Sequence, residues 1–135
     1  MENKQNNSEM KIRLEKQITN DMLVQLFEGS LYGGSNYWYY IMSDFSKEDW
    51  YKKEDLCFSE KLAEALLADE LQLEIVDVET KEFLGFINKE NFLKGFLLCA
   101  DYDHEITDRL LYDIIDSDDA DVLLQFVVMG EVVYG

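Results

Sequence analysis

The sequence predicts an α+β fold in which about four helices pack on a small antiparallel sheet of about three to four strands. Stretches with helical apolar spacing and stretches with alternating apolar spacing follow one another in mixed order. Proline is absent, and no internal repeat or low-complexity tract marks a boundary between domains. With 135 residues, 47% of them hydrophobic, the chain is long enough for one core. We therefore expect a flexible tail over residues 1–9 and a single globular domain over residues 10–135.

The first elements are predicted from alternation and from capping residues. Residues 10–19 alternate apolar and polar side chains, which is typical of a half-buried strand. Residues 19–21 are Thr, Asn and Asp, which favour a helix start, and the apolar residues after them predict a helix to about Glu28. The aromatic span 36–42 is compatible with either a strand or a helix.

The middle of the chain predicts a surface segment, a helix and a hairpin. Residues 43–55 are mostly charged, and their bulky aromatic side chains are expected to turn inward. Ser59 is the candidate N-cap of a helix over residues 59–68. Residues 71–77 alternate as a strand, and residues 83–87 are expected to pair back on them.

The next part predicts two helical stretches separated by an acidic loop. Asn88 is the candidate N-cap of a helix from Lys89 to about Ala100. Residues 101–105 are expected to form the loop, and residues 106–115 either a short helix or an extended piece.

The C-terminal stretch 116–135 predicts a core helix that passes into a core strand. Four of its first six residues are aspartates, which favour a helix N-terminus because they interact with its dipole and unpaired N–H groups. An apolar run follows, and a helix of that composition must be buried. Gly130 is a plausible helix stop. The expected last strand, Val132–Tyr134, is a candidate partner for a first strand at Ile12–Ile18.

Charge is the strongest global property of the chain. There are 29 acidic residues against 12 basic ones, giving a net charge of −17. This excess makes direct nucleic-acid binding unfavourable because phosphates would be repelled, and it favours soluble monomers, basic partners or cations. We expect no membrane span and no secretory signal, and we interpret Cys57 and Cys99 as buried thiols. Together these features predict a cytoplasmic protein.

The acids concentrate between residues 101 and 121, where nine of them accompany one base, Arg109. Carboxylates spaced along a rigid surface can occupy a basic groove by mimicking phosphates. The alternative is a solvated surface with helix-capping acids. Under the first interpretation the partner-binding acids are Asp101, Asp103, Glu105, Asp108, Asp113, Asp116, Asp118, Asp119 and Asp121.

The aromatic segment supplies three further candidate contacts, Tyr37, Trp38 and Tyr40. Aromatic side chains dominate cores, so packing is one explanation. A protein-binding patch is the other, because Tyr and Trp are common interface anchors.

The sequence carries no recognisable catalytic or metal-binding motif. His104 is the single histidine and has no nearby nucleophile in the sequence, and the acids do not follow calcium-loop spacing. We therefore expect no enzyme activity, no metal and no cofactor. A small enzyme using His104 and clustered carboxylates remains an alternative.

The chain resembles a group of small acidic proteins encoded in phages, prophages and other mobile elements of bacteria, and three groups of residues carry the resemblance. The groups are Glu28-Gly29 with Gly33–Trp38, the strand and helix at Leu71–Asp77 and Lys89–Leu98, and Asp116–Asp121 with Gln125 and Gly130–Gly135. The residues Ser30–Gly33 are an insertion relative to that pattern. The resemblance implies a genomic context and no mechanism.

These features together predict a non-enzymatic acidic binding protein of a phage or mobile element. It would inhibit or modulate a host nucleic-acid-binding protein of defence or regulation by phosphate mimicry, presenting carboxylates where phosphates would sit. The alternative is a structural or homodimeric interaction protein that uses the aromatic segment.

Overall fold

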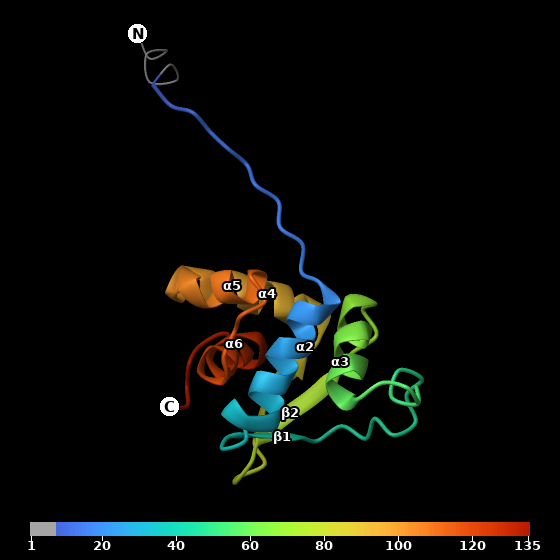
Figure 1. Cartoon of the computed structure of the whole chain (residues 1–135). Helices are drawn as coiled ribbons and strands as arrows, with labels where there is room; N and C mark the ends of the chain where they lie inside the picture. Colours follow the sequence, from blue (N-terminus) through green and yellow to red (C-terminus); the bar gives the residue numbers. More distant parts are fainter. Residues whose placement is uncertain (1–7) are drawn as a thin grey trace.

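Three strands form an antiparallel sheet in the computed structural model, which describes residues 8–135 (Figure 1). Strand β1 is Tyr39–Ile41, β2 is Leu73–Asp77 and β3 is Phe83–Ile87. Their order is β1-β2-β3, and an irregularity interrupts the β2–β3 register between Ile75 and Val76. The predicted hairpin is confirmed, and the ambiguous aromatic span contains a strand.

Five α-helices and one π-helical turn accompany the sheet within the described part of the chain, so the α+β class is confirmed. Their bounds are α2 Asn20–Gly29, η1 Ser30–Gly34, α3 Phe58–Leu67, α4 Lys89–Tyr102, α5 His104–Leu111 and α6 Ser117–Met129.

Capping explains where most of these helices begin and end. The side chains of Thr19, Asn88 and Asp116 accept backbone N–H groups at the starts of α2, α4 and α6, as predicted. Gly130 ends α6 with a φ of 79°, in the left-handed region that glycine tolerates. The predicted cap Ser59 is wrong, because the N-cap of α3 is Cys57, two residues earlier, and the helix begins at Phe58.

The predicted acidic loop at residues 101–105 is also wrong. Helix α4 continues to Tyr102, and α5 starts at His104. The break is confined to Asp103, whose extended backbone separates the helices and whose carboxylate accepts the Glu105 N–H at 3.1 Å. The uncertain stretch 106–115 is helical as far as Leu111.

The predicted strand at residues 10–19 does not form. Residues 8–17 are exposed, and Met10, Ile12 and Leu14 are 87%, 75% and 78% exposed. Figure 1 shows this segment extending from the start of α2 away from the body of the molecule. An alternating pattern defines two faces of a strand, but it does not supply the neighbouring strand that would pair with it. The tail expected over residues 1–9 lies mainly outside the described residues.

Residues 132–134 likewise form no strand, so the predicted pairing of the last strand with the first is wrong. A side chain replaces a strand partner here. Gln125 Oε1 accepts the N–H groups of Val133 and Tyr134 at 2.8 and 2.9 Å, and Gln125 Nε2 donates to the Tyr134 carbonyl at 3.1 Å. The tail therefore runs along α6 instead of joining the sheet.

Helix α6 is the centre of the core, as its apolar sequence predicted. Its residues 123–128 are all buried, and it contacts α2, α4 and β3. Two glycines allow the backbones of α4 and β3 to approach α6 closely. A Cβ at Gly95 of α4 would lie 2.6 Å from Val127 N, and a Cβ at Gly85 of β3 would lie 1.9 Å from Val128 O. The backbones of α4 and β3 therefore press directly against the last turns of α6.

Candidate functional site

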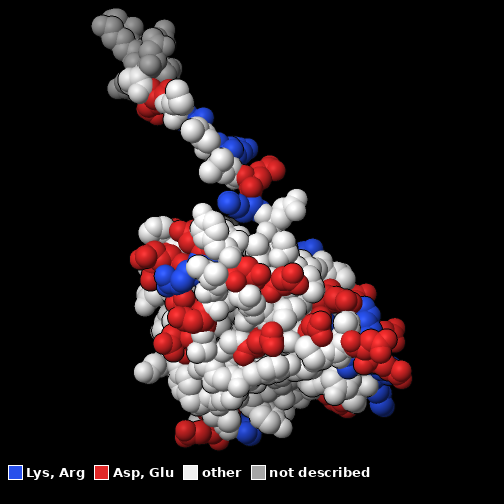
Figure 2. Space-filling view, viewed as in Figure 1, with Lys and Arg blue, Asp and Glu red and all other residues white. Residues whose placement is uncertain are grey.

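Four of the predicted partner-binding acids are exposed, take part in none of the ion pairs between residues 8–135 and cap no helix. They are Asp101 at the end of α4, Glu105 and Asp108 on α5, and Asp118 in the first turn of α6. We call these four residues the acidic surface. Figure 2 shows acidic side chains over α4 and α5 with a basic side chain among them, and a second group on the right that also contains basic side chains. The acidic surface is thus the part of the acid-rich stretch that can meet a partner.

The other acids of the stretch are helix caps or lie partly or fully buried in the fold. Asp103 and Asp116 cap α5 and α6, with Asp116 accepting the Asp119 N–H at 2.8 Å. Asp113 is half-buried with a φ of 62°, and its Oδ1 has no hydrogen-bond partner. Asp119 is 8% exposed. Its place in the core corrects the expectation that Asp119 lies on the surface.

Asp119 is buried because Arg109 neutralises it. The guanidinium donates to Asp119 through Nε and through Nη2, the latter at 3.0 Å, which is a bidentate ion pair. The hydrogen bond with Asp119 raises the pKa of Arg109, and the nearby charges of Glu105 and Asp116 add to the effect. The single base of the stretch is therefore used internally, which leaves the acidic surface without a cation of its own.

Asp121 joins the aromatic segment to α6. Its Oδ1 accepts hydrogen bonds from Ser35 Oγ at 2.8 Å and from Trp38 Nε1 at 2.7 Å, and its Oδ2 accepts one from Tyr37 OH at 2.7 Å. Burial and this carboxylate raise the pKa of Tyr37 to about 12. Trp38 is 0% exposed, which corrects its predicted place in a contact patch.

The C-terminal tail closes the same network from the other side. The Tyr134 ring stacks on Trp38 with centroids 5.3 Å apart and an angle of 10° between the planes. Tyr134 OH donates to Asp77 Oδ2 at 2.6 Å. Burial and that carboxylate raise the pKa of Tyr134 to about 12, and the hydrogen bond from Tyr134 is the main cause that lowers the pKa of Asp77 to about 2. The tail is thereby fixed to both α6 and the sheet.

An open hollow of about 560 Å³ lies where the tail, η1 and α6 meet. It brings together three of the predicted partner-binding residues, Tyr37, Asp118 and Asp121, with Tyr134 and Gly135. Asp121 is already engaged by its hydrogen bonds, whereas Asp118 is exposed at the hollow. The sequence predicted these three residues as separate candidate contacts. That Tyr134 lies beside them in one hollow becomes visible only in the folded structure.

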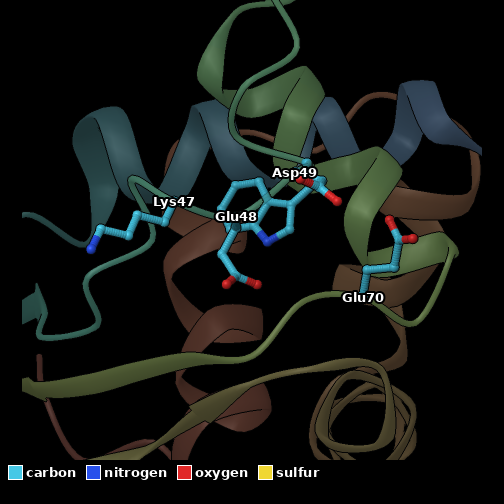
Figure 3. A pocket seen from close by; sticks show the side chains of 5 residues that line it. Lys47, Glu48, Asp49 and Glu70 are labelled. Carbon is cyan, nitrogen blue, oxygen red and sulfur yellow. The ribbon is translucent and has the colours of Figure 1, made fainter.

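A second hollow of about 270 Å³ lies beside the surface segment 44–55 and is lined by Lys47, Glu48, Asp49, Trp50 and Glu70. Figure 3 shows the Lys47 side chain extending to the side opposite Glu70. Trp50 is 4% exposed and stacks on Phe45, which confirms the prediction that the aromatic side chains of this segment turn inward. Residues 44–55 carry three lysines beside five acidic residues, so their excess of negative charge is smaller than that of residues 101–121, and this hollow is a weaker candidate than the acidic surface.

Tyr37 and Tyr40 are the exposed members of the predicted aromatic patch, at 50% and 47%. Lys81 Nζ lies 4.3 Å from the centroid of the Tyr40 ring. Tyr40 is on β1 and pairs with Val76, whereas Tyr37 faces the hollow beside Asp118. The three candidate aromatics are therefore divided between the core and two parts of the surface.

The other predicted reactive residues are dispersed. His104 is exposed at the start of α5. Cys99 is buried, as expected, and burial raises the pKa of its thiol to about 12. Cys57 is exposed, which corrects its predicted burial. Among residues 8–135, no group of three or more His, Cys, Asp or Glu side chains is arranged to hold a metal ion.

Comparison with known proteins gives no match to any family model, any curated protein or any solved structure. The resemblance to mobile-element proteins therefore stays a prediction. None of the helices formed by residues 8–135 has the length and apolar character needed to cross a membrane.

Proposed function

We propose that this chain is a non-enzymatic acidic binding protein whose acidic surface engages a cationic surface of another protein. The observation that carries the proposal is the exposure of Asp101, Glu105, Asp108 and Asp118 with no ion pair to any described base. A cationic partner would supply the counter-charges that the fold does not. The attraction would be long-ranged and would weaken with salt.

A nucleic-acid-binding protein is the partner class that best matches this chemistry. Its basic groove is built to hold phosphates, and carboxylates held on helices can take their places. The hollow beside Asp118 adds a recess in which a Lys or Arg side chain can approach a carboxylate and the Tyr37 ring. We extend the proposal to a phage or mobile-element protein that inhibits a host defence or regulatory protein in the cytoplasm.

The first experiment identifies the partner and tests the role of charge. The tagged protein is used to capture binding proteins from a bacterial host lysate, which are eluted with a salt gradient. The affinity of the purified partner is then measured by calorimetry at several salt concentrations. We expect the affinity to fall as salt rises, and double-stranded DNA to compete with the acidic protein for the same partner.

The decisive comparison uses two variants with equal changes of charge. The surface variant carries Asp101→Asn, Glu105→Gln, Asp108→Asn and Asp118→Asn. The control carries Glu48→Gln, Asp49→Asn, Glu54→Gln and Asp55→Asn in an exposed segment elsewhere. The surface variant should bind at least about tenfold more weakly and with a flatter salt dependence, while the control should stay close to the unmodified protein. Equal affinities for the two variants would refute the proposal.

A further inference from the structure

Helix α4 presents apolar side chains on two opposite faces. Phe92, Gly95 and Cys99 are buried against the core, as expected for an amphipathic helix. Four large residues on the outward side are nevertheless exposed, namely Leu93 at 53%, Leu97 at 67%, Leu98 at 46% and Tyr102 at 62%. Apolar side chains gathered on one exposed helix face are typical of an interaction surface.

The charges on this outward face are arranged symmetrically about its middle. Lys94 lies three residues before Leu97, and Asp101 lies three residues after Leu98; both are exposed. If two copies of α4 meet antiparallel on a two-fold axis between Leu97 and Leu98, each Leu97 faces the other copy's Leu98. Each Lys94 then faces an Asp101, and each Leu93 faces a Tyr102. The face is therefore complementary to itself in charge and in apolar character, as a two-fold interface requires.

We propose that the outward face of α4 is a homodimer interface in which Lys94 of each copy pairs with Asp101 of the other. Lys94 now forms an ion pair with Glu90 at 3.4 Å. Because both side chains of this pair are about 70% exposed, Lys94 can exchange Glu90 for Asp101 of the second copy. The geometry favours a second copy over an unrelated basic partner, since the face carries matched opposite charges. This proposal does not depend on the proposed function. In the dimer Asp101 faces Lys94 of the second copy, which leaves Glu105, Asp108 and Asp118 exposed to a cationic partner.

Neighbouring segments extend the face beyond the single helix. A stable interface buries about 800 Å² per partner, which is more than one helix of this length supplies. Lys16 and Ile18 line an apolar hollow of about 260 Å³ together with Lys89 and Leu93. The segment before them carries the exposed Met10, Ile12 and Leu14. Lys16 and Ile18 therefore add to the edge of the α4 face, and the exposed residues before them are available to add further contact area in a dimer.

The test is a charge exchange measured by analytical ultracentrifugation of the full chain from roughly 5 to roughly 500 µM. The unmodified protein should shift from monomer to dimer over this range. Lys94→Asp should raise the dimer dissociation constant at least about tenfold, because it places like charges opposite one another. Combining Lys94→Asp with Asp101→Lys should restore dimerisation. Lys47→Asp, which makes the same charge change far from α4, should have little effect.

Three outcomes would overturn the proposal, provided that circular dichroism shows each variant folded. The first is a monomer at every concentration. The second is a double variant as weak as Lys94→Asp alone. The third is an equal loss with Lys47→Asp, which would reflect net charge only. Leu97→Gln offers an independent check, since it alters an exposed side chain and should weaken the dimer without unfolding the chain. None of these measurements uses the cationic partner, so failure here leaves the proposed function standing.

Discussion

Asp121 illustrates, at the scale of one residue, how an acid in an acid-rich stretch can serve the fold. Its position among four aspartates predicted a surface charge, yet it accepts hydrogen bonds from Ser35, Tyr37 and Trp38. Hydrogen bonds to a charged acceptor are each worth about 1.5–3 kcal/mol. The sequence could not reveal this, because these donors are more than 80 residues away along the chain.

The pair Tyr134 and Asp77 predicts how stability depends on pH at both extremes. The pKa of Tyr134 rises from 10.0 to about 12, so its neutral form stabilises the fold fully below pH 10 and progressively less as pH rises to 12. The pKa of Asp77 falls from 3.8 to about 2, so its ionised form stabilises the fold above pH 3.8 and this contribution is lost as pH falls to 2.

The measurement is the urea midpoint as a function of pH, followed by tryptophan fluorescence, for the unmodified protein and for Tyr134→Phe. Phenylalanine keeps the stacking on Trp38 but cannot donate to Asp77. We expect the variant to be less stable at neutral pH and to lose less stability on approach to pH 2 and to pH 12. Parallel pH curves for the two proteins would show that the hydrogen bond contributes little.

At the scale of elements, the contact between α4 and α6 depends on a glycine. A Cβ on Gly95 would lie 2.6 Å from the Val127 backbone, and backbone cannot move aside as a flexible side chain can. Gly95→Ala should therefore reduce the free energy of unfolding by about 1–3 kcal/mol, although alanine favours helices. Chemical denaturation measures the change. The matched control is Gly33→Ala, where a Cβ meets nothing within 4 Å and little change is expected.

The helices were predictable because capping and periodicity are local properties of the chain. The start of α2 at Thr19, the start of α4 at Asn88 and the end of α6 at Gly130 all follow from side-chain or backbone preferences within a few residues. The cap at Ser59 and the loop at residues 101–105 were placed wrongly within the helical regions, whereas the two strands that failed to form concern pairing. Residues 10–19 and 132–134 have strand-like composition, but their own sequence does not show whether a neighbouring strand is there to pair with them. In the C-terminal tail, Gln125 Oε1 accepts the N–H groups of Val133 and Tyr134 in place of a strand.

The candidate site was predictable in part for the same reason. Composition located the acid-rich stretch and thus Asp101, Glu105, Asp108 and Asp118, all of which are exposed. It could not distinguish them from Asp119, whose burial depends on the position of Arg109 across two helices.

At the scale of the whole molecule, the net charge is −17, and few of the acidic residues that the structure describes form ion pairs. Between residues 8 and 135 these are Lys53 with Glu64, Lys94 with Glu90, and Arg109 with Asp119. The first two pairs are exposed, and pairs of that kind contribute about 0–1 kcal/mol each. Repulsion between the remaining carboxylates therefore opposes the compact state.

Salt should consequently stabilise this protein. The distance over which charges interact falls from about 30 Å at 0.01 M salt to about 8 Å at 0.15 M, so repulsion across the molecule is screened first. We expect the thermal midpoint to rise over that range in both sodium and potassium chloride, and to rise less in the variant that removes the four carboxylates of the acidic surface. A midpoint that is constant or falls with salt would mean that the carboxylates are compensated within the fold, and the acidic surface would then have little need of a cationic partner.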